Sequence, residues 1–143
     1  MMVTEVASYL DAQLTTLTVG ANLFMGIMPE GTSDGVTTPD ECVAVFESPG
    51  MPPIILGGQV GAGSSRITRP KLQVQARGNP GDYPGARALL KSVVDKLDLV
   101  LDSTLIGVRY YRIELITDLN VLKRDEYDRV TFYAEFDVHK DYS

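Results

Sequence analysis

Three carboxylates near the C-terminal end, Asp125, Glu126 and Asp128, are the residues whose types and spacing first suggest chemistry. Grouped carboxylates can act as general acids and bases or bind calcium. Here Arg124 and Arg129 flank the group, and the spacing lacks the central glycine of an EF-hand loop. The sequence therefore predicts a salt-bridged turn rather than a catalytic or metal site.

The other reactive side chains stand alone. His139 is the single histidine, with no cysteine beside it to complete a metal site or a triad, and we expect it to be exposed. Cys42 lies in an apolar run and is most simply a small core residue, because a reactive thiol needs a neighbouring base or cation. We assign no catalytic, cofactor-binding or metal-binding residue.

A Gly/Pro-rich stretch over residues 48–70 invites comparison with a phosphate-binding loop. Such a loop ends in Lys-Ser or Lys-Thr and opens a helix, whereas this stretch has no such pair and leads into a strand pattern. We therefore expect a long connection, mobile over about residues 57–69, that becomes ordered against a partner. The predicted contact residues are Gln59, Val60, Arg66 and Arg69, with Arg124, Asp125 and Glu126 from the acidic turn.

Arg66, Arg69, Lys71 and Arg77 form a local basic group along this stretch and the strand pattern after it. Such a group is usually a solvated edge, although an acidic partner surface could use it. Alternation over residues 71–77 places Lys71 and Arg77 on the outward face.

Secondary-structure elements must position these residues, and residues 129–139 give the clearest signal for one. Apolar and polar side chains alternate along this stretch. We interpret this stretch as a central strand, with further strands over residues 21–28, 41–47, 71–77 and 108–116. Helices are expected over residues 5–14, capped by Thr4, and from Asp82 or Tyr83 to about Leu97. The predicted core includes Phe132, Phe136, Val74, Leu89, Val93 and Leu97.

These elements predict one α+β domain over residues 1–143: a mainly antiparallel sheet of about four to five strands, two packed helices and a long Gly/Pro-rich loop. The size of 143 residues suits a single core. A net charge of −6 disfavours a general nucleic-acid binder, and no apolar run has the length of a membrane span. The N-terminal residues lack the basic region of a signal peptide, so we expect synthesis inside a cell.

Four weak motifs follow one another through most of the chain: residues 23–29 (LFMGIMP) after the first helix, 43–50 (VAVFESPG), 70–78 (PKLQVQARG) and 124–129 (RDEYDR). In this order they resemble the tail-terminator, or tail-completion, proteins of long-tailed bacteriophages, also called minor capsid proteins. The resemblance implies a structural, non-enzymatic virion protein without cofactors.

By this resemblance, the protein caps the completed tail tube as a homomeric ring, most simply a hexamer, and offers a surface for head–tail joining. The implied partners are other copies of the chain, the major tail tube protein and the head–tail connector of the neck. DNA passes through the pore without specific binding, and no membrane is involved. The implied location is the head-proximal end of the tail in the virion, and the host cytoplasm during assembly.

Two alternatives remain open at this point. The protein could be a head-completion or connector protein from the neck of the same particle, because such proteins have similar size and composition. A small hydrolase or nucleotide-binding enzyme would have to use Asp125, Glu126, Asp128 or His139, but the sequence offers it no nucleophile–base pair.

Overall fold

In the computed structural model of the chain, the described residues are 1–31, 39–56 and 65–141. Two helices and seven strands follow one another along these residues. Their bounds are α1 Met2–Gln13, β1 Leu23–Met25, β2 Cys42–Leu56, β3 Ser65–Arg77, α2 Tyr83–Leu97, β4 Leu101–Leu105, β5 Val108–Leu115, β6 Asn120–Arg124 and β7 Val130–Asp141.

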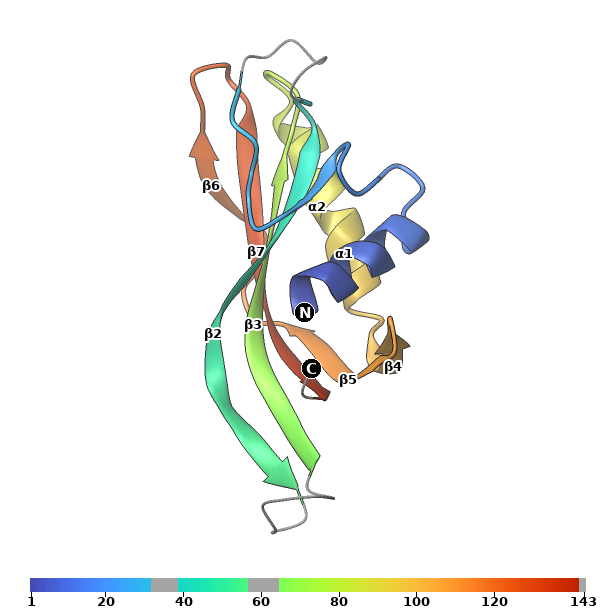
Figure 1. Cartoon of the computed structure of the whole chain (residues 1–143). Helices are drawn as coiled ribbons and strands as arrows, with labels where there is room; N and C mark the ends of the chain where they lie inside the picture. The colour runs from blue at the N-terminus through green and yellow to red at the C-terminus, as the bar shows by residue number, and fades with distance from the viewer. Residues whose placement is uncertain (32–38, 57–64, 142–143) are drawn as a thin grey trace.

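Strand β7 lies in the middle of the sheet, as the alternation over residues 129–139 predicts. The strand order is β1-β2-β3-β7-β5-β4, and β6 also pairs with β7 (Figure 1). All pairings are antiparallel except that of β1 with β2. β7 therefore has three neighbours, β3 along most of one edge and β5 and β6 on the other.

The predicted count of four to five strands is wrong, because the described chain forms a seven-stranded sheet. The two missed strands, β4 and β6, carry no alternating pattern. All five residues of β6 are exposed, and Asp102 in β4 has a φ of 47°, which interrupts the regular alternation of side chains. The α+β character holds, since both predicted helices are present.

The expected long connection over residues 48–70 is instead mostly strand. β2 and β3 form an antiparallel hairpin that pairs from Cys42 and Arg77 out to Leu56 and Ser65. Pro52 and Pro53 fall within a register shift between Met51 and Ile54. Proline lacks a backbone N–H, and at this irregular position that lack removes no hydrogen bond from the regular strand pairing. The prolines therefore interrupt the pairing without ending the strand.

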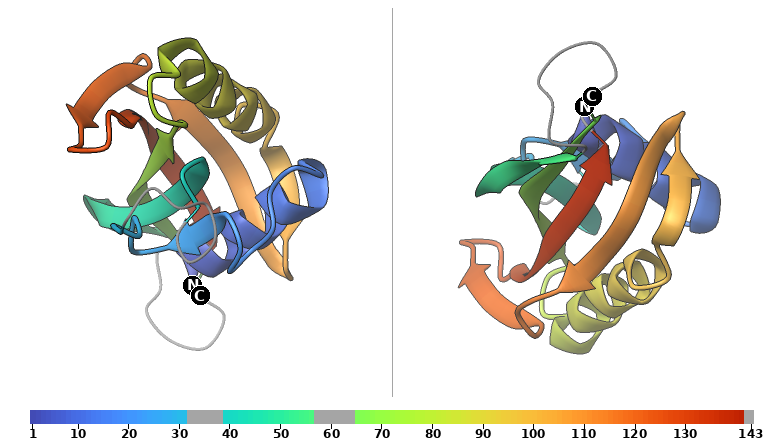
Figure 2. Two further views of the ribbon diagram at one scale, coloured as in Figure 1. Left: turned by 90° about the horizontal axis from the view of Figure 1, so that it is seen from above. Right: turned by 90° about the horizontal axis from the view of Figure 1, so that it is seen from below.

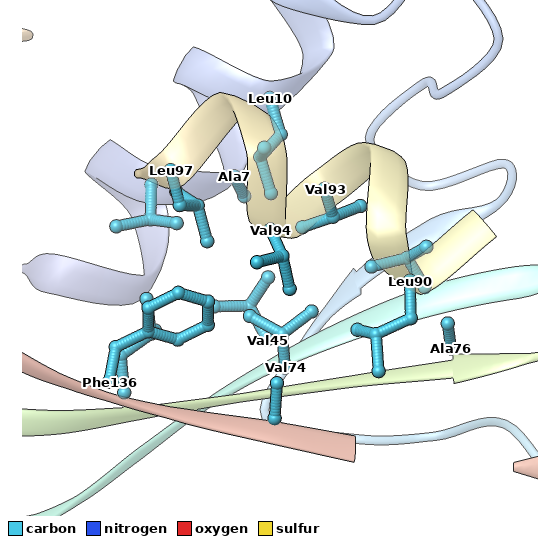
Figure 3. Packing of buried hydrophobic residues seen from close by; sticks show 14 of the residues in the cluster. Ala7, Leu10, Val45, Val74, Ala76, Leu90, Val93, Val94, Leu97 and Phe136 are labelled. Carbon is cyan, nitrogen blue, oxygen red and sulfur yellow. The ribbon is translucent and has the colours of Figure 1, made fainter. Parts of the chain in front are cut away.

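Both helices cover one face of the sheet, which curls around them (Figure 2). α1 contacts β1 and β2 near one edge and β4 at the other, while α2 contacts β3, β5 and β7 in between. Figure 3 shows side chains of both helices above Val45, Val74 and Phe136 of the sheet. Of the six predicted core residues, Leu89 alone is only partly buried.

Local signals explain where the helices begin. Asp82 caps α2 by accepting a 3.0 Å hydrogen bond from the Gly85 backbone N–H, and Pro84 lies in the first turn. The predicted cap of α1 is wrong, because the helix already begins at Met2 and Thr4 lies inside it. Met1 occupies the cap position without a side-chain hydrogen bond.

Candidate functional site

A buried arginine organises the turn before β7. The Arg129 side chain is about 2% exposed, and its Nε donates to Asp125 Oδ2 at 2.7 Å. The same guanidinium donates to Asp40 Oδ1 at 3.1 Å and to the Gly31 carbonyl at 2.9 Å, and it lies 4.9 Å from the centre of the Tyr127 ring. The predicted salt-bridged turn is confirmed, and it also holds the segments on either side of residues 32–38.

The carboxylate of Asp125 is bound too tightly for acid–base chemistry. Partial burial alone would raise the pKa of Asp125, but hydrogen bonds from the backbone and guanidinium of Arg129 and the backbone of Tyr127 outweigh it. The net effect lowers the pKa of Asp125, so the group stays ionised near neutral pH. Arg124 pairs with Asp128 on the surface.

Glu126 is exposed beside a surface cavity of about 400 Å³ that this turn forms with the chain at Glu30 and Gly31. An ion pair of 2.7 Å between Lys123 and Glu30 joins β6 to the segment around residue 30. The turn and the segment around residue 30 thus form one charged surface at this end of the sheet.

Arg77 contradicts its predicted outward position, because its relative exposure is 2%. Its guanidinium donates to the carbonyls of Pro29 at 2.6 Å, Pro39 at 2.6 Å and Asp40 at 2.9 Å. These carbonyls lie on either side of residues 32–38 and cover the end of β3. No local pattern around Arg77 could have predicted that cover.

Arg66 and Arg69 lie within β3 rather than in a loop, so the mobile segment predicted for residues 57–69 is wrong for its last five residues. Arg69 donates twice to the Pro52 carbonyl, from Nε at 2.9 Å and from Nη2 at 2.7 Å, and thereby braces the hairpin. Gln59, Val60 and the rest of residues 57–64 lie outside the described residues.

The predicted contact residues do not form one site. Arg69 lies on the hairpin where β3 nears the C-terminal end of β7, whereas Arg124 pairs with Val130 at the opposite end of β7. The two groups therefore lie toward opposite ends of the sheet (Figure 1).

Sequence reasoning missed a buried ionic network between α1 and the sheet. Glu5 Oε1 accepts from Tyr110 Oη at 2.9 Å and from Lys140 Nζ at 3.3 Å, and the other carboxylate oxygen binds the Met1 amino group. Burial alone would raise the pKa of Glu5, but these partners lower it overall. Burial raises the pKa of Tyr110, and the hydrogen bond to Glu5 raises it further. Extending the alternation of residues 129–139 by one position would have placed Lys140 on the inward face.

The isolated reactive residues show no catalytic arrangement. Cys42 is buried as predicted, burial raises the pKa of its thiol, and its Sγ lies 3.4 Å from Met28 Sδ. His139 is half-buried, contrary to the predicted exposure, because its strand lies within the sheet. Among the described residues, no group of three His, Cys, Asp or Glu side chains could hold a metal ion. Within the same residues, no helix is long and apolar enough to cross a membrane.

A comparison with protein families identifies the family of this chain. The sequence profile described as "Bacteriophage tail terminator protein" matches residues 10–142. The chain belongs to the bacteriophage tail terminator family. This membership confirms the resemblance of the four motifs and makes the protein a structural component of a phage virion.

A solved structure agrees with this terminator fold. A chain from the structure described as "Virion of native gene transfer agent (GTA) particle" superposes with a TM-score of 0.58 and 14% sequence identity. The match covers 99% of this chain and 96% of that chain, so the likeness of fold is not confined to one part. A search of curated proteins gives no match.

Proposed function

We propose that this terminator closes the head-proximal end of the completed tail tube as a homomeric ring of six copies, and that the ring receives the head–tail connector. The family match over residues 10–142 is the observation that carries the proposal. The proposed role is structural, and the pairing of Asp125 and Asp128 with arginines agrees with it.

The fold supports a protein that joins two different partners. One end of the sheet carries the charged surface around Arg129, Glu126 and Lys123. The other end carries the β2–β3 hairpin, which extends beyond both helices (Figure 1). A ring that joins tube and connector needs two chemically different faces, and these two ends supply them.

DNA passes through the ring in this proposal without being gripped. The net charge of −6 gives the protein no surplus of lysine and arginine to neutralise phosphates. The open face of β3 and β7 is lined by polar groups that bond to one another, Gln75 to Gln73 at 2.9 Å and Gln73 to Glu135 at 3.4 Å.

A sedimentation experiment tests the proposed position. Purified protein is mixed either with tails that lack heads or with heads that lack tails, and each particle is pelleted and assayed for the protein. We expect the protein to pellet with tails alone. Binding only to tailless heads would contradict the terminator position and favour a head-completion or connector protein.

A further inference from the structure

The core-facing side of the sheet extends further than the helices that cover it. Along β3 the inward positions run from buried Leu72 to Pro70 and Thr68, and on β2 Glu47 pairs with Leu72 and yet is exposed. This uncovered stretch forms a groove of about 740 Å³ between the start of α1 and the hairpin. Its lining includes Glu47, Met51, Pro53, Thr68, Pro70 and Lys140.

The groove is largely apolar at its rim, and its charged groups are mainly positive. Met51 is 60% exposed. The lining of the groove holds the cations of the Met1 amino group, Arg69 and Lys140 against the carboxylate of Glu47. The buried Glu5 behind it pairs with both the Met1 amino group and Lys140. A copy of this chain, whose net charge is −6, can therefore approach the groove without like-charge repulsion.

An exposed apolar tip lies on the same chain. Ile106 and Gly107 form the two-residue turn between β4 and β5, with φ values of 46° and 75°. Such a turn favours Asn-Gly or Gly-Gly, because a β-branched residue is strained at positive φ. The Ile106 side chain is also 61% exposed. Within the described residues, burial of this side chain therefore does not offset the strain of its backbone.

The tip carries no surplus charge. On the strands that lead to it, Asp102 and Arg109 form an ion pair of 2.8 Å. Copies of a chain with net charge −6 repel one another, so their contacts are favoured where negative charge is not in surplus. The groove and the tip are both such places.

We propose that the Ile106 tip of one copy inserts into the groove beside Met51 of a second copy. The contact joins two different surfaces, so repetition is head-to-tail and closes into a ring when the rotation fits. This inference rests on the proposed function and assigns the surfaces that make the ring.

Ile106→Asn gives a test in which stability and assembly change in opposite directions. Asn tolerates the positive φ of this turn, so we expect the midpoint of thermal unfolding, Tm, to rise by about 2–6 °C. Loss of the buried isoleucine should raise the protein concentration that half-saturates head-free tails by about 10- to 100-fold. Ile27→Asn, at an equally exposed isoleucine outside the turn, is the control and should leave half-saturation unchanged.

Half-saturation that is unchanged in Ile106→Asn would overturn the inference. If wild-type protein still caps tails in that case, the proposed function stands and the ring uses another surface. If wild-type protein does not bind tails at all, the proposed function itself fails.

Engineered cysteines test the pairing of tip and groove directly. Cys42 is buried, so the background of cross-linking is low. On assembled tails, a variant with both Ile106→Cys and Met51→Cys should give a ladder of covalent oligomers with a short thiol cross-linker. A mixture of the two single variants should stop at dimers, and each single variant alone should give none. Dimers from Ile106→Cys alone, or no ladder from the double variant, would overturn the pairing.

Discussion

The guanidinium of Arg129 lies 2.7 Å from the carboxylate of Asp125 and 3.1 Å from that of Asp40, with its own side chain almost fully buried. One cation at the start of the central strand therefore binds two carboxylates, one on its own turn and one on the segment after residue 38. Removing either partner of such a pair costs more than the pair contributes, because the remaining charge stays in a poorly solvated place.

Arg129→Ala should lower the free energy of unfolding by about 2–4 kcal/mol. This loss is smaller than for a fully buried ion pair, because Asp125 and Asp40 are partly exposed to solvent. Urea denaturation measures the loss. Arg124→Ala is the matched control, since Arg124 pairs with Asp128 on the surface, and it should cost under about 0.5 kcal/mol. Equal losses in the two variants would contradict the assigned role of Arg129.

Phe136 tests the assignment of the inner face of β7. It is fully buried beneath the helices, and Phe136→Ala should cost about 3–5 kcal/mol in urea denaturation through lost burial and a residual cavity. Leu101→Ala is the control, because Leu101 is mostly exposed, and the expected change is below about 0.5 kcal/mol. A loss well under 1 kcal/mol for Phe136→Ala would mean that the faces of the strand are reversed.

The buried carboxylate of Glu5 predicts a loss of stability in acid. Its pKa is lowered in the folded protein, so its contribution is fully present above the ordinary value of 4.5 and is lost as the pH falls through the folded value. Urea denaturation between pH 7 and pH 3 should show a smaller acid-induced loss in Glu5→Gln than in the wild type. Asp125 adds a similar loss that both proteins share. Identical pH profiles would contradict the lowered pKa of Glu5.

Duplex DNA should bind the purified protein only weakly, with a dissociation constant above about 10⁻⁴ M at physiological salt. Fluorescence anisotropy with a labelled duplex measures this. As a positive control, Glu135→Lys with Asp137→Lys places cations on the open face of β7 and should increase salt-dependent binding. Tight, strongly salt-dependent binding by the wild type would contradict passive passage of DNA.

The sequence predicts the elements that carry a strong period. The alternation in β7 and the apolar stripe of α2 arise because one face of each element is buried, which produces a periodic pattern of apolar residues. β6 is exposed along its length and β4 has an interrupted alternation, so neither strand shows such a pattern. The β2–β3 hairpin was missed for another reason, because its prolines signal a loop unless they fall at register shifts.

The candidate site was predicted only where its partners are close in sequence. Asp125 and Arg129 are four residues apart, so their pairing follows from the chain itself. Arg77 binds carbonyls 37 to 48 residues away, and Glu5 binds Lys140 across 135 residues. Those contacts depend on the tertiary fold, which no local pattern of charge or hydrophobicity specifies.

The number and position of copies on finished tails test the central claim most directly. Head-free tails are purified with the protein bound, its copies per tail are counted by quantitative mass spectrometry, and its position is located by electron microscopy. The account predicts six copies in a closed ring at one end of the tube, the end that joins the head. One or two copies per tail, or copies spread along the tube, would contradict it.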